Sequence, residues 1–234
     1  MRLLNNKNIL LFFIMAIALT ILGSKTYGIY QKYQNIKEES QKQESFNKLN
    51  NILDIAQEEL LYSAVYMTIR NQNILTKLKY KQTKLDKLNN NNLIPKKELK
   101  NIRTRVENGD KDYLNIFFNS YENKIIKPII ESMSRISSSN DIKNQLKLIN
   151  IKEYINMENS LLAFILNEKI VMSNRDLTQW NRLLSQMIFP NFLPFQNKKI
   201  ETKINKILDG DSFSKIALKT RAKIFLESQN GDYS

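Results

Sequence analysis

The scarcity of glycine and proline is the sequence feature that most constrains the fold. The 234 residues include 5 glycines and 4 prolines, whereas average usage gives about 12% for the two together. Sandwiches and barrels of β-strands need a turn every few residues, and glycine and proline supply most turns. A chain of this length is also long enough to bury a sizeable core. The composition therefore predicts an all-α protein.

The absence of two residue types excludes most familiar active sites. The chain has no cysteine and no histidine, so it offers no thiol nucleophile, no imidazole base and no typical zinc or haem ligand set. We therefore expect no metal, no cofactor and no enzymatic activity. Binding, sensing and scaffolding are the functions that this composition favours.

The positive charge of the chain is spread along its length. The formal net charge is +13, but no basic block exceeds a pair such as Lys96-Lys97 or Lys198-Lys199. Nucleic-acid-binding proteins concentrate basic residues on an arm or stripe, often with aromatic residues between them. The distribution therefore predicts a solvated lysine-rich surface and no nucleic-acid partner.

An apolar run near the N-terminus predicts a membrane anchor. Residues 9–23 are uncharged and almost wholly apolar, and they follow a short start that carries Arg2 and Lys7. The run is shorter than the roughly 20 residues of a spanning helix, but it reaches residue 30 if Lys25 extends to the interface. A cleaved signal peptide is the alternative. The anchor predicts contact with membrane lipid through residues 9–30 and a single-pass protein of the cytoplasmic membrane, with the rest in the periplasm or outside.

Apolar residues at helical spacing continue through the remainder of the chain. We expect an N-terminal transmembrane helix (1–30), a helical stalk (31–43) and an up-and-down helical bundle (44–234) in two similar halves, at about 44–137 and 140–230. Asp110 and Asp141 are expected to cap the long helices that follow them, and Pro128 to kink the first of these. The expected helices between the stalk and the C-terminus cover residues 44–71, 74–88, 96–106, 110–136, 141–165, 174–184, 198–208 and 212–227. An aromatic-proline loop is expected at 189–195, and a helix-helix turn at Asp209-Gly210-Asp211.

Each expected half carries a glutamate on the apolar stripe of a helix. Glu59 and Glu158 each have apolar or aromatic residues one turn before and after. A buried glutamate needs an ion pair, a hydrogen bond or a proton. Two interpretations follow: each glutamate either fixes the bundle by pairing with a facing helix, or lines a ligand site. Arg103 and Arg105 are the arginines that could receive an anion, although on an exposed helix they would be solvated. Trp180, the single tryptophan, is expected to fill the core.

Four short motifs resemble those of the nitrate- and nitrite-sensing (NIT) domains of bacterial receptors. The segment Glu59–Met67 resembles the E-R-G-x-S-A-x-Y-L signature of that family. Gln82-Thr83 with Asp86, the helix Tyr121–Ile130, and Lys152-Glu153 with Met157-Glu158-Asn159 resemble later family landmarks in the same order. The resemblance covers residues 44–227. It implies an all-helical extracytoplasmic input module.

The resemblance also implies a set of ligand-binding residues. Carried over to this chain, they are Glu59, Ser63, Tyr66, Glu158 and Asn159. In the family an arginine follows each signature glutamate and helps to hold the oxyanion, whereas this chain has Leu60 and Asn159 there. Because leucine cannot bond an anion and asparagine lacks the charge, we expect a small anion or metabolite other than nitrate.

Two functions from different classes remain open. The first is a membrane-anchored sensory or ligand-binding domain of a bacterial signal-transduction system, whose output passes through a partner protein or a homo-oligomer. The second is a periplasmic scaffold or accessory protein of a membrane machine, such as a chemoreceptor array or flagellar motor.

Overall fold

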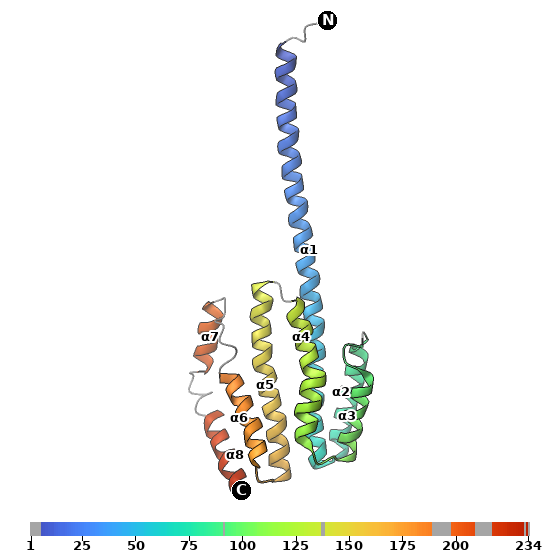
Figure 1. Ribbon diagram of the computed structural model, residues 1–234, viewed down its shortest axis with the longest axis vertical. Helices are drawn as coiled ribbons and strands as arrows, with labels where there is room; N and C mark the ends of the chain where they lie inside the picture. The colour runs from blue at the N-terminus through green and yellow to red at the C-terminus, as the bar shows by residue number, and fades with distance from the viewer. Residues whose placement is uncertain are drawn as a thin grey trace. The chain divides into compact units, whose positions relative to one another are not determined.

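The computed structural model consists of helices joined by short turns in the part of the chain that it describes (Figure 1). The backbone is described for residues 6–90, 92–136, 139–188, 198–208, 217–231 and 233, and the side chains of 6–18 and of a few residues near the C-terminus lie outside the description. No strand occurs among these residues, so the prediction of an all-α fold is confirmed. The elements are α1 (Asn6–Ile69), α2 (Gln72–Leu88), α3 (Lys96–Asn108), η1 (Asn115–Ile126), α4 (Lys127–Ile136), α5 (Asn140–Glu168), α6 (Asn174–Ile188), α7 (Lys198–Leu208) and α8 (Leu218–Asn230).

The chain divides into two compact units. The first is Met1–Ser45 and the second is Phe46–Ser234. Helix α1 belongs to both, and its described side chains from Leu19 to Tyr30 are exposed. Among the residues that the structure describes, no helix combines the length and the apolar character needed to cross a membrane. The anchor expected at 9–30, many of whose side chains lie outside the description, is therefore not supported by this structure.

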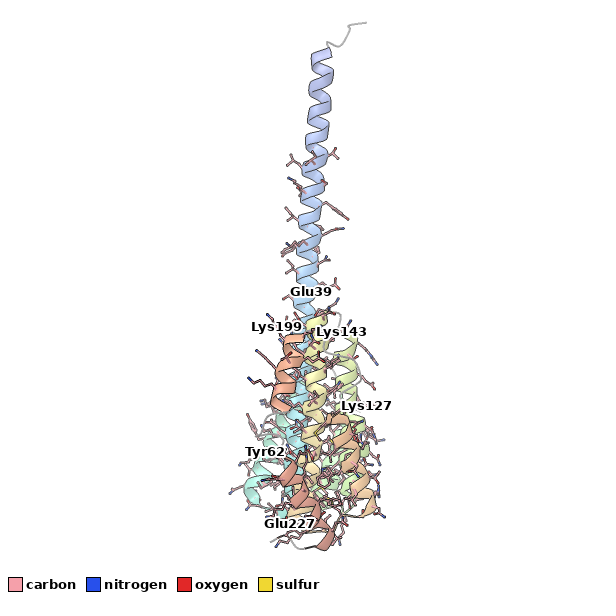
Figure 2. All side chains as sticks on the ribbon, turned by 90° about the vertical axis from the view of Figure 1, so that its left-hand side faces the viewer. Glu39, Tyr62, Lys127, Lys143, Lys199 and Glu227 are labelled. Atoms are coloured by element: carbon pink, nitrogen blue, oxygen red, sulfur yellow. The ribbon has the colours of Figure 1, made fainter. Side chains whose placement is uncertain are left out.

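The second unit is a helical bundle with one contiguous core. Several of its helices run side by side, with α3 against η1 and α5 against α4, η1 and α6, while α4 continues η1 directly (Figure 1). The buried stripe of α1, including Phe46 and Leu53, packs with η1 residues such as Phe117. Lysines such as Lys127 and Lys143 are exposed on the surface of this unit (Figure 2). The predicted helical bundle is confirmed.

The caps of two helices differ from the sequence prediction. Asp110 does not cap the helix after it: its carboxylate accepts a hydrogen bond from the backbone N–H of Asp112, and Asp112 in turn accepts from the N–H of Asn115 at 3.4 Å. Ser139, rather than Asp141, caps α5 by accepting from the N–H of Ile142 at 3.3 Å. In both cases several residues that can cap lie close together, and the chain path selects one of them.

The helix predicted over 110–136 has two different backbone registers. Its first part, η1, is a π-helix, and α4 follows it directly. The backbone N–H of Lys127 donates to the carbonyl of Glu122, five residues back. Pro128 has no N–H and its ring crowds the carbonyl four residues earlier, so the irregularity expected at Pro128 lies beside a change from π to α register. The loop 189–195 and the turn at Asp209-Gly210-Asp211 lie outside the described residues.

Candidate functional site

Glu59 lies at the centre of a buried hydrogen-bond cluster between α1, α3 and η1. Its side chain is 0% exposed, which confirms the prediction that it faces the interior. Arg103 donates two parallel hydrogen bonds to it, from Nε to Oε1 and from Nη2 to Oε2, both at 2.9 Å. The hydroxyl of Tyr121 also donates to Oε1, at 3.1 Å. Such a fork is the strongest form of arginine–carboxylate pairing.

Arg103 has no N–H left for a ligand. Beyond its two bonds to Glu59, Nη1 donates to both carboxylate oxygens of Asp86 at 2.8 and 2.9 Å. Nη2 also donates to the backbone carbonyl of Gln82 at 3.2 Å. These five contacts use the five donors of a guanidinium. The expectation that Arg103 would be solvated is therefore wrong.

The ionisation of this cluster follows from its contacts. Burial lowers the pKa of Arg103, but the bonds and charges of Glu59 and Asp86 outweigh burial and raise that pKa above its ordinary value. Burial and the nearby charge of Glu59 raise the pKa of the Tyr121 hydroxyl well above its usual range. Arginine therefore stays charged and tyrosine stays neutral at any ordinary pH.

Ser63 joins the same cluster, whereas Tyr66 does not. The hydroxyls of Ser63 and Tyr121 lie 2.9 Å apart, and both are buried. Tyr66 is half-buried and packs against the core. Ser63 is therefore hydrogen-bonded to the tyrosine hydroxyl that donates to Glu59.

Glu158 occupies a second cluster with the same plan. It is 3% exposed, as predicted, and Arg221 of α8 grips it through Nε to Oε1 at 2.8 Å and Nη2 to Oε2 at 2.6 Å. The indole Nε1 of Trp180 donates to Oε1 at 2.8 Å. Trp180 is thus buried, as predicted, and also hydrogen-bonded. Asn159, the neighbouring candidate, is exposed.

The two clusters are built alike but share no partner among the described residues. Each consists of a buried glutamate, an arginine fork from a later helix and one aromatic donor. A buried carboxylate with this complete set of donors is a stable ion pair. The contacts favour the interpretation in which Glu59 and Glu158 fix the bundle.

The other arginine considered as an anion holder is also engaged. Arg105 donates to Asp110 at 2.7 Å and to the side-chain oxygen of Asn115 at 2.7 Å. It therefore closes the turn between α3 and η1, and the expectation of a solvated side chain is wrong for Arg105 as well.

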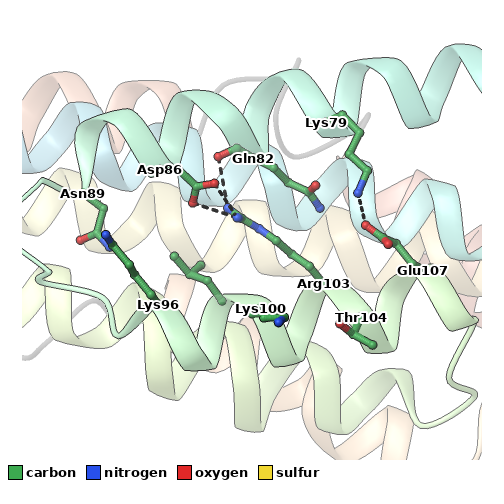
Figure 3. A pocket seen from close by; sticks show the side chains of 10 residues that line it. Lys79, Gln82, Asp86, Asn89, Lys96, Lys100, Arg103, Thr104 and Glu107 are labelled. Carbon is green, nitrogen blue, oxygen red and sulfur yellow. Dashed lines mark hydrogen bonds and ion pairs between the residues drawn. The ribbon is translucent and has the colours of Figure 1, made fainter.

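A pocket lies beside the Glu59 cluster, between α2 and α3 (Figure 3). Its volume is about 590 Å³. Charged and polar side chains of both helices surround it. They are Lys79, Gln82, Asp86 and Asn89 of α2 and its C-cap, and Lys96, Lys100, Arg103, Thr104 and Glu107 of α3.

The groups left without partners in this pocket are hydrogen-bond donors. Its two carboxylates form ion pairs, Asp86 with Arg103 and Glu107 with Lys79. Lys96 and Lys100 form no ion pair within the described part of the chain. The side chain of Gln82 is 5% exposed, and its Nε2 has no hydrogen-bond partner. Figure 3 shows this amide between α2 and α3. The pocket can therefore bind an anion, to which two lysines and one amide would donate hydrogen bonds.

Sequence reasoning identified Gln82 and Asp86 only as landmarks and did not identify Arg221. No local signal distinguishes these residues, because their surroundings come from helices far away in the chain. Comparison of the chain with protein-family models, curated proteins and solved structures gives no match. The chemistry of the site therefore rests on its own residues.

Proposed function

We propose that residues 46–234 form a ligand-binding sensory module for a small organic or inorganic anion, and that the pocket between α2 and α3 is its binding site. The observation that carries the proposal is the buried, unpaired amide of Gln82 beside Lys96 and Lys100. An unpaired buried donor is costly, and a ligand acceptor would satisfy it. The resemblance to NIT domains supports the same class of function.

The proposed ligand differs from nitrate in size and in the groups that hold it. No arginine follows either signature glutamate, and both Arg103 and Arg105 are engaged. A pocket of about 590 Å³ accommodates a dicarboxylate or a phosphorylated metabolite. The remaining lysines suit a carboxylate or phosphate group, which they bind as point charges.

The place of the module in the cell belongs to the same proposal. Residues 9–30 would anchor it in the cytoplasmic membrane, the bundle would face the periplasm or the outside, and a protein partner or second copy would carry the output. The apolar run at 9–23 and the basic residues before it support this arrangement.

A scaffold is the second candidate function, and a specific observation favours it. Both stripe glutamates have complete partner sets within the chain. A bundle fixed in this way does not need a ligand to satisfy its buried charges.

Thermal unfolding of the full chain separates the two candidates. Trp180 is the single tryptophan and is buried, so its fluorescence reports unfolding. Succinate and inorganic phosphate, each compared with sodium chloride at equal ionic strength, should raise the midpoint, because a ligand of the native state stabilises it by mass action. A rise of about 2–4 °C corresponds to about 1 kcal/mol for a domain of this size.

Variants connect that rise to the pocket. Lys96→Met with Lys100→Met should abolish it, and Lys77→Met, an exposed lysine of α2 that does not line the pocket, should leave it intact. If neither anion raises the midpoint above the chloride control, the anion site is wrong and the scaffold is favoured.

A further inference from the structure

A second cavity lies between η1, α4, α5 and α6. Its volume is about 360 Å³. The walls combine aliphatic side chains, among them Ile126 and Ile130, with amides, among them Asn123 and Asn150. The rest of the lining is polar or charged, so the cavity suits a ligand that has a charged group and a short apolar part. The cavity shares no lining residue with the pocket between α2 and α3.

Glu153 brings a carboxylate without a partner into this cavity. Its side chain is 3% exposed, it lines the cavity, and its Oε1 has no hydrogen-bond partner. The contrast with Glu59 and Glu158 is direct, since each of those buried glutamates has three donors from side chains. A buried carboxylate in this condition needs a proton or a cation.

The cations around the cavity do not meet that need. Arg182 of α6 lines the cavity and its charge acts on Glu153, but it is bound to Glu122 of η1 by two hydrogen bonds of 2.8 and 2.6 Å. Its guanidinium also stacks over the ring of Phe118, 5.2 Å from the centroid. Lys127 of α4 lines the cavity but is exposed. The remaining titratable groups, Glu131 of α4 and Tyr154 of α5, offer no positive charge.

The protonation of Glu153 is consistent with an unmet charge. Burial, together with the negative charge of Glu122, raises the pKa of Glu153 to about 8, and Arg182 opposes this shift only in part. At neutral pH the empty site therefore keeps a proton on the carboxylate.

The backbone at the cavity is also unusual. Glu122, Asn123 and Ile126 lie on η1, a π-helix of 12 residues. Wide π turns are rare and are frequently found at functional sites. Here the π register ends at the cavity, where α4 begins.

We infer that this cavity binds a small organic cation, a primary aliphatic amine, whose ammonium group takes the place of the proton on Glu153. An ammonium has three donors, and the carboxylate of Glu153 with the amide oxygens of Asn123 and Asn150 supplies acceptors. The isoleucines suit the alkyl chain. Among the described residues no three histidine, cysteine or acidic side chains gather in a way that could hold a metal ion, which favours an organic cation over a metal.

The exchange is a transfer of one proton. The O–H bond of Glu153 breaks, its proton passes to solvent, and the ionised carboxylate pairs with the incoming ammonium. As the pH decreases below 8, the affinity for the amine should fall about tenfold for each pH unit, because one proton is displaced for each amine bound. Above pH 8 the affinity should become constant until the amine itself loses its proton.

Isothermal titration calorimetry of the full chain with n-butylamine tests this inference. Butan-1-ol has nearly the same shape without the charge and serves as the ligand control. At pH 7, titrations in two buffers of different ionisation enthalpy should give the release of close to one proton per amine bound. Saturable binding of butan-1-ol as strong as that of n-butylamine, or amine binding without proton release, would overturn the inference.

Variants locate the site. Glu153→Gln keeps the size of the side chain and should weaken amine binding at least about 30-fold, the low end of the loss when one partner of a buried charge pair is removed. Glu168→Gln, on the exposed end of the same helix, should bind as the wild type does. Retention of wild-type affinity and proton release in Glu153→Gln contradicts the site, whatever the outcome with succinate and phosphate.

Discussion

At the scale of residues, the bundle contains buried glutamates in two different conditions. Glu59 and Glu158 are each held by an arginine fork and an aromatic donor. Glu153 is equally buried and lacks such a partner. A buried carboxylate with a complete set of donors becomes destabilising if one of those donors is removed. A buried carboxylate without donors can take up a proton or bind a ligand. The sequence placed Glu59 and Glu158 on apolar stripes, but Glu153 has Asn150 and Asn156 one turn away, and its burial was not predicted.

Removal of Arg103 should be costly. Arg103→Met leaves the fully buried Glu59 without its cation, and the loss of one partner of a buried pair costs about 3–5 kcal/mol. Urea unfolding followed by Trp180 fluorescence measures this. The double variant Arg103→Met with Glu59→Leu should recover a large part of the loss, because no unpaired carboxylate remains at position 59.

An exposed arginine provides the matched control. Arg175 is 64% exposed and lies 4.0 Å from Asp112, and an exposed pair contributes about 0–1 kcal/mol. Arg175→Met should therefore change the free energy of unfolding little. If Arg103→Met were equally mild, Glu59 would not depend on the fork for its burial.

At the scale of elements, the connection from α3 through η1 to α4 organises both candidate sites. Neighbouring residues of the π-helix reach different helices, Tyr121 to Glu59 of α1 and Glu122 to Arg182 of α6. The turn before η1 is closed by Arg105, which binds Asp110. The conformation of this turn thus fixes where the π-helix begins.

Gly109 should be essential to that turn. It ends α3 with φ of 67°, and the N–H groups of Gly109 and Asp110 donate to the carbonyls of Val106 and Arg105, as in a Schellman motif. Gly109→Ala places an L-residue in the left-handed region, at a cost of about 1–2 kcal/mol, and its Cβ would overlap the guanidinium of Arg70. We expect a lower midpoint in urea.

Two further variants separate the backbone from the clash. Adding Arg70→Ala to Gly109→Ala removes the contact but not the backbone cost, so most of the loss should remain. Gly109→Asn should be milder than Gly109→Ala, because asparagine tolerates the left-handed region better. A midpoint for Gly109→Ala equal to that of the wild type would show that the turn does not need its left-handed residue.

At the scale of the whole molecule, four consecutive elements of the bundle unit meet around Glu153. η1 and α4 come from the first part of that unit, and α5 and α6 follow in the chain. A charge at Glu153 therefore acts on the contact between these helices. Folding of the unit should depend on whether that carboxylate holds its proton.

The stability of the chain should decrease with rising pH because of Glu153. Its pKa is about 8 in the folded chain, against an ordinary value of 4.5, so the folded state keeps a proton that the unfolded state gives up. The contribution of Glu153 is fully present below pH 4.5, is lost as pH rises toward 8, and is constant beyond that.

Urea unfolding at a series of pH values, in wild type and in Glu153→Gln, isolates this contribution. Other groups, such as Asp110 with its lowered pKa, affect both proteins equally and cancel in the difference. The free energy of unfolding of wild type minus that of Glu153→Gln should fall between about pH 4.5 and 8. A difference independent of pH would mean that Glu153 is ionised in the folded chain.

Much of the secondary structure could be predicted from the sequence because its causes are local. Few glycines and prolines, together with apolar residues at three-four spacing, gave helices close to α2, α3, α5 and α6. The same spacing gave the burial of Glu59 and Glu158, since a residue on the apolar stripe must face the core. Where several local signals compete, as with the caps at Asp112 and Ser139, the sequence led to the wrong residue.

The partners of the buried charges were decided by tertiary structure alone. Arg103 is 44 residues from Glu59, and Arg221 is 63 residues from Glu158, so no local pattern connects them. The cavity at Glu153 likewise exists because four elements meet, and the arginine that they bring to it, Arg182, is paired with Glu122. The sequence by itself determined that Glu59 and Glu158 are buried, through the helical period, whereas the packing of distant helices buried Glu153 and decided which of these carboxylates have partners and which remains open to a ligand.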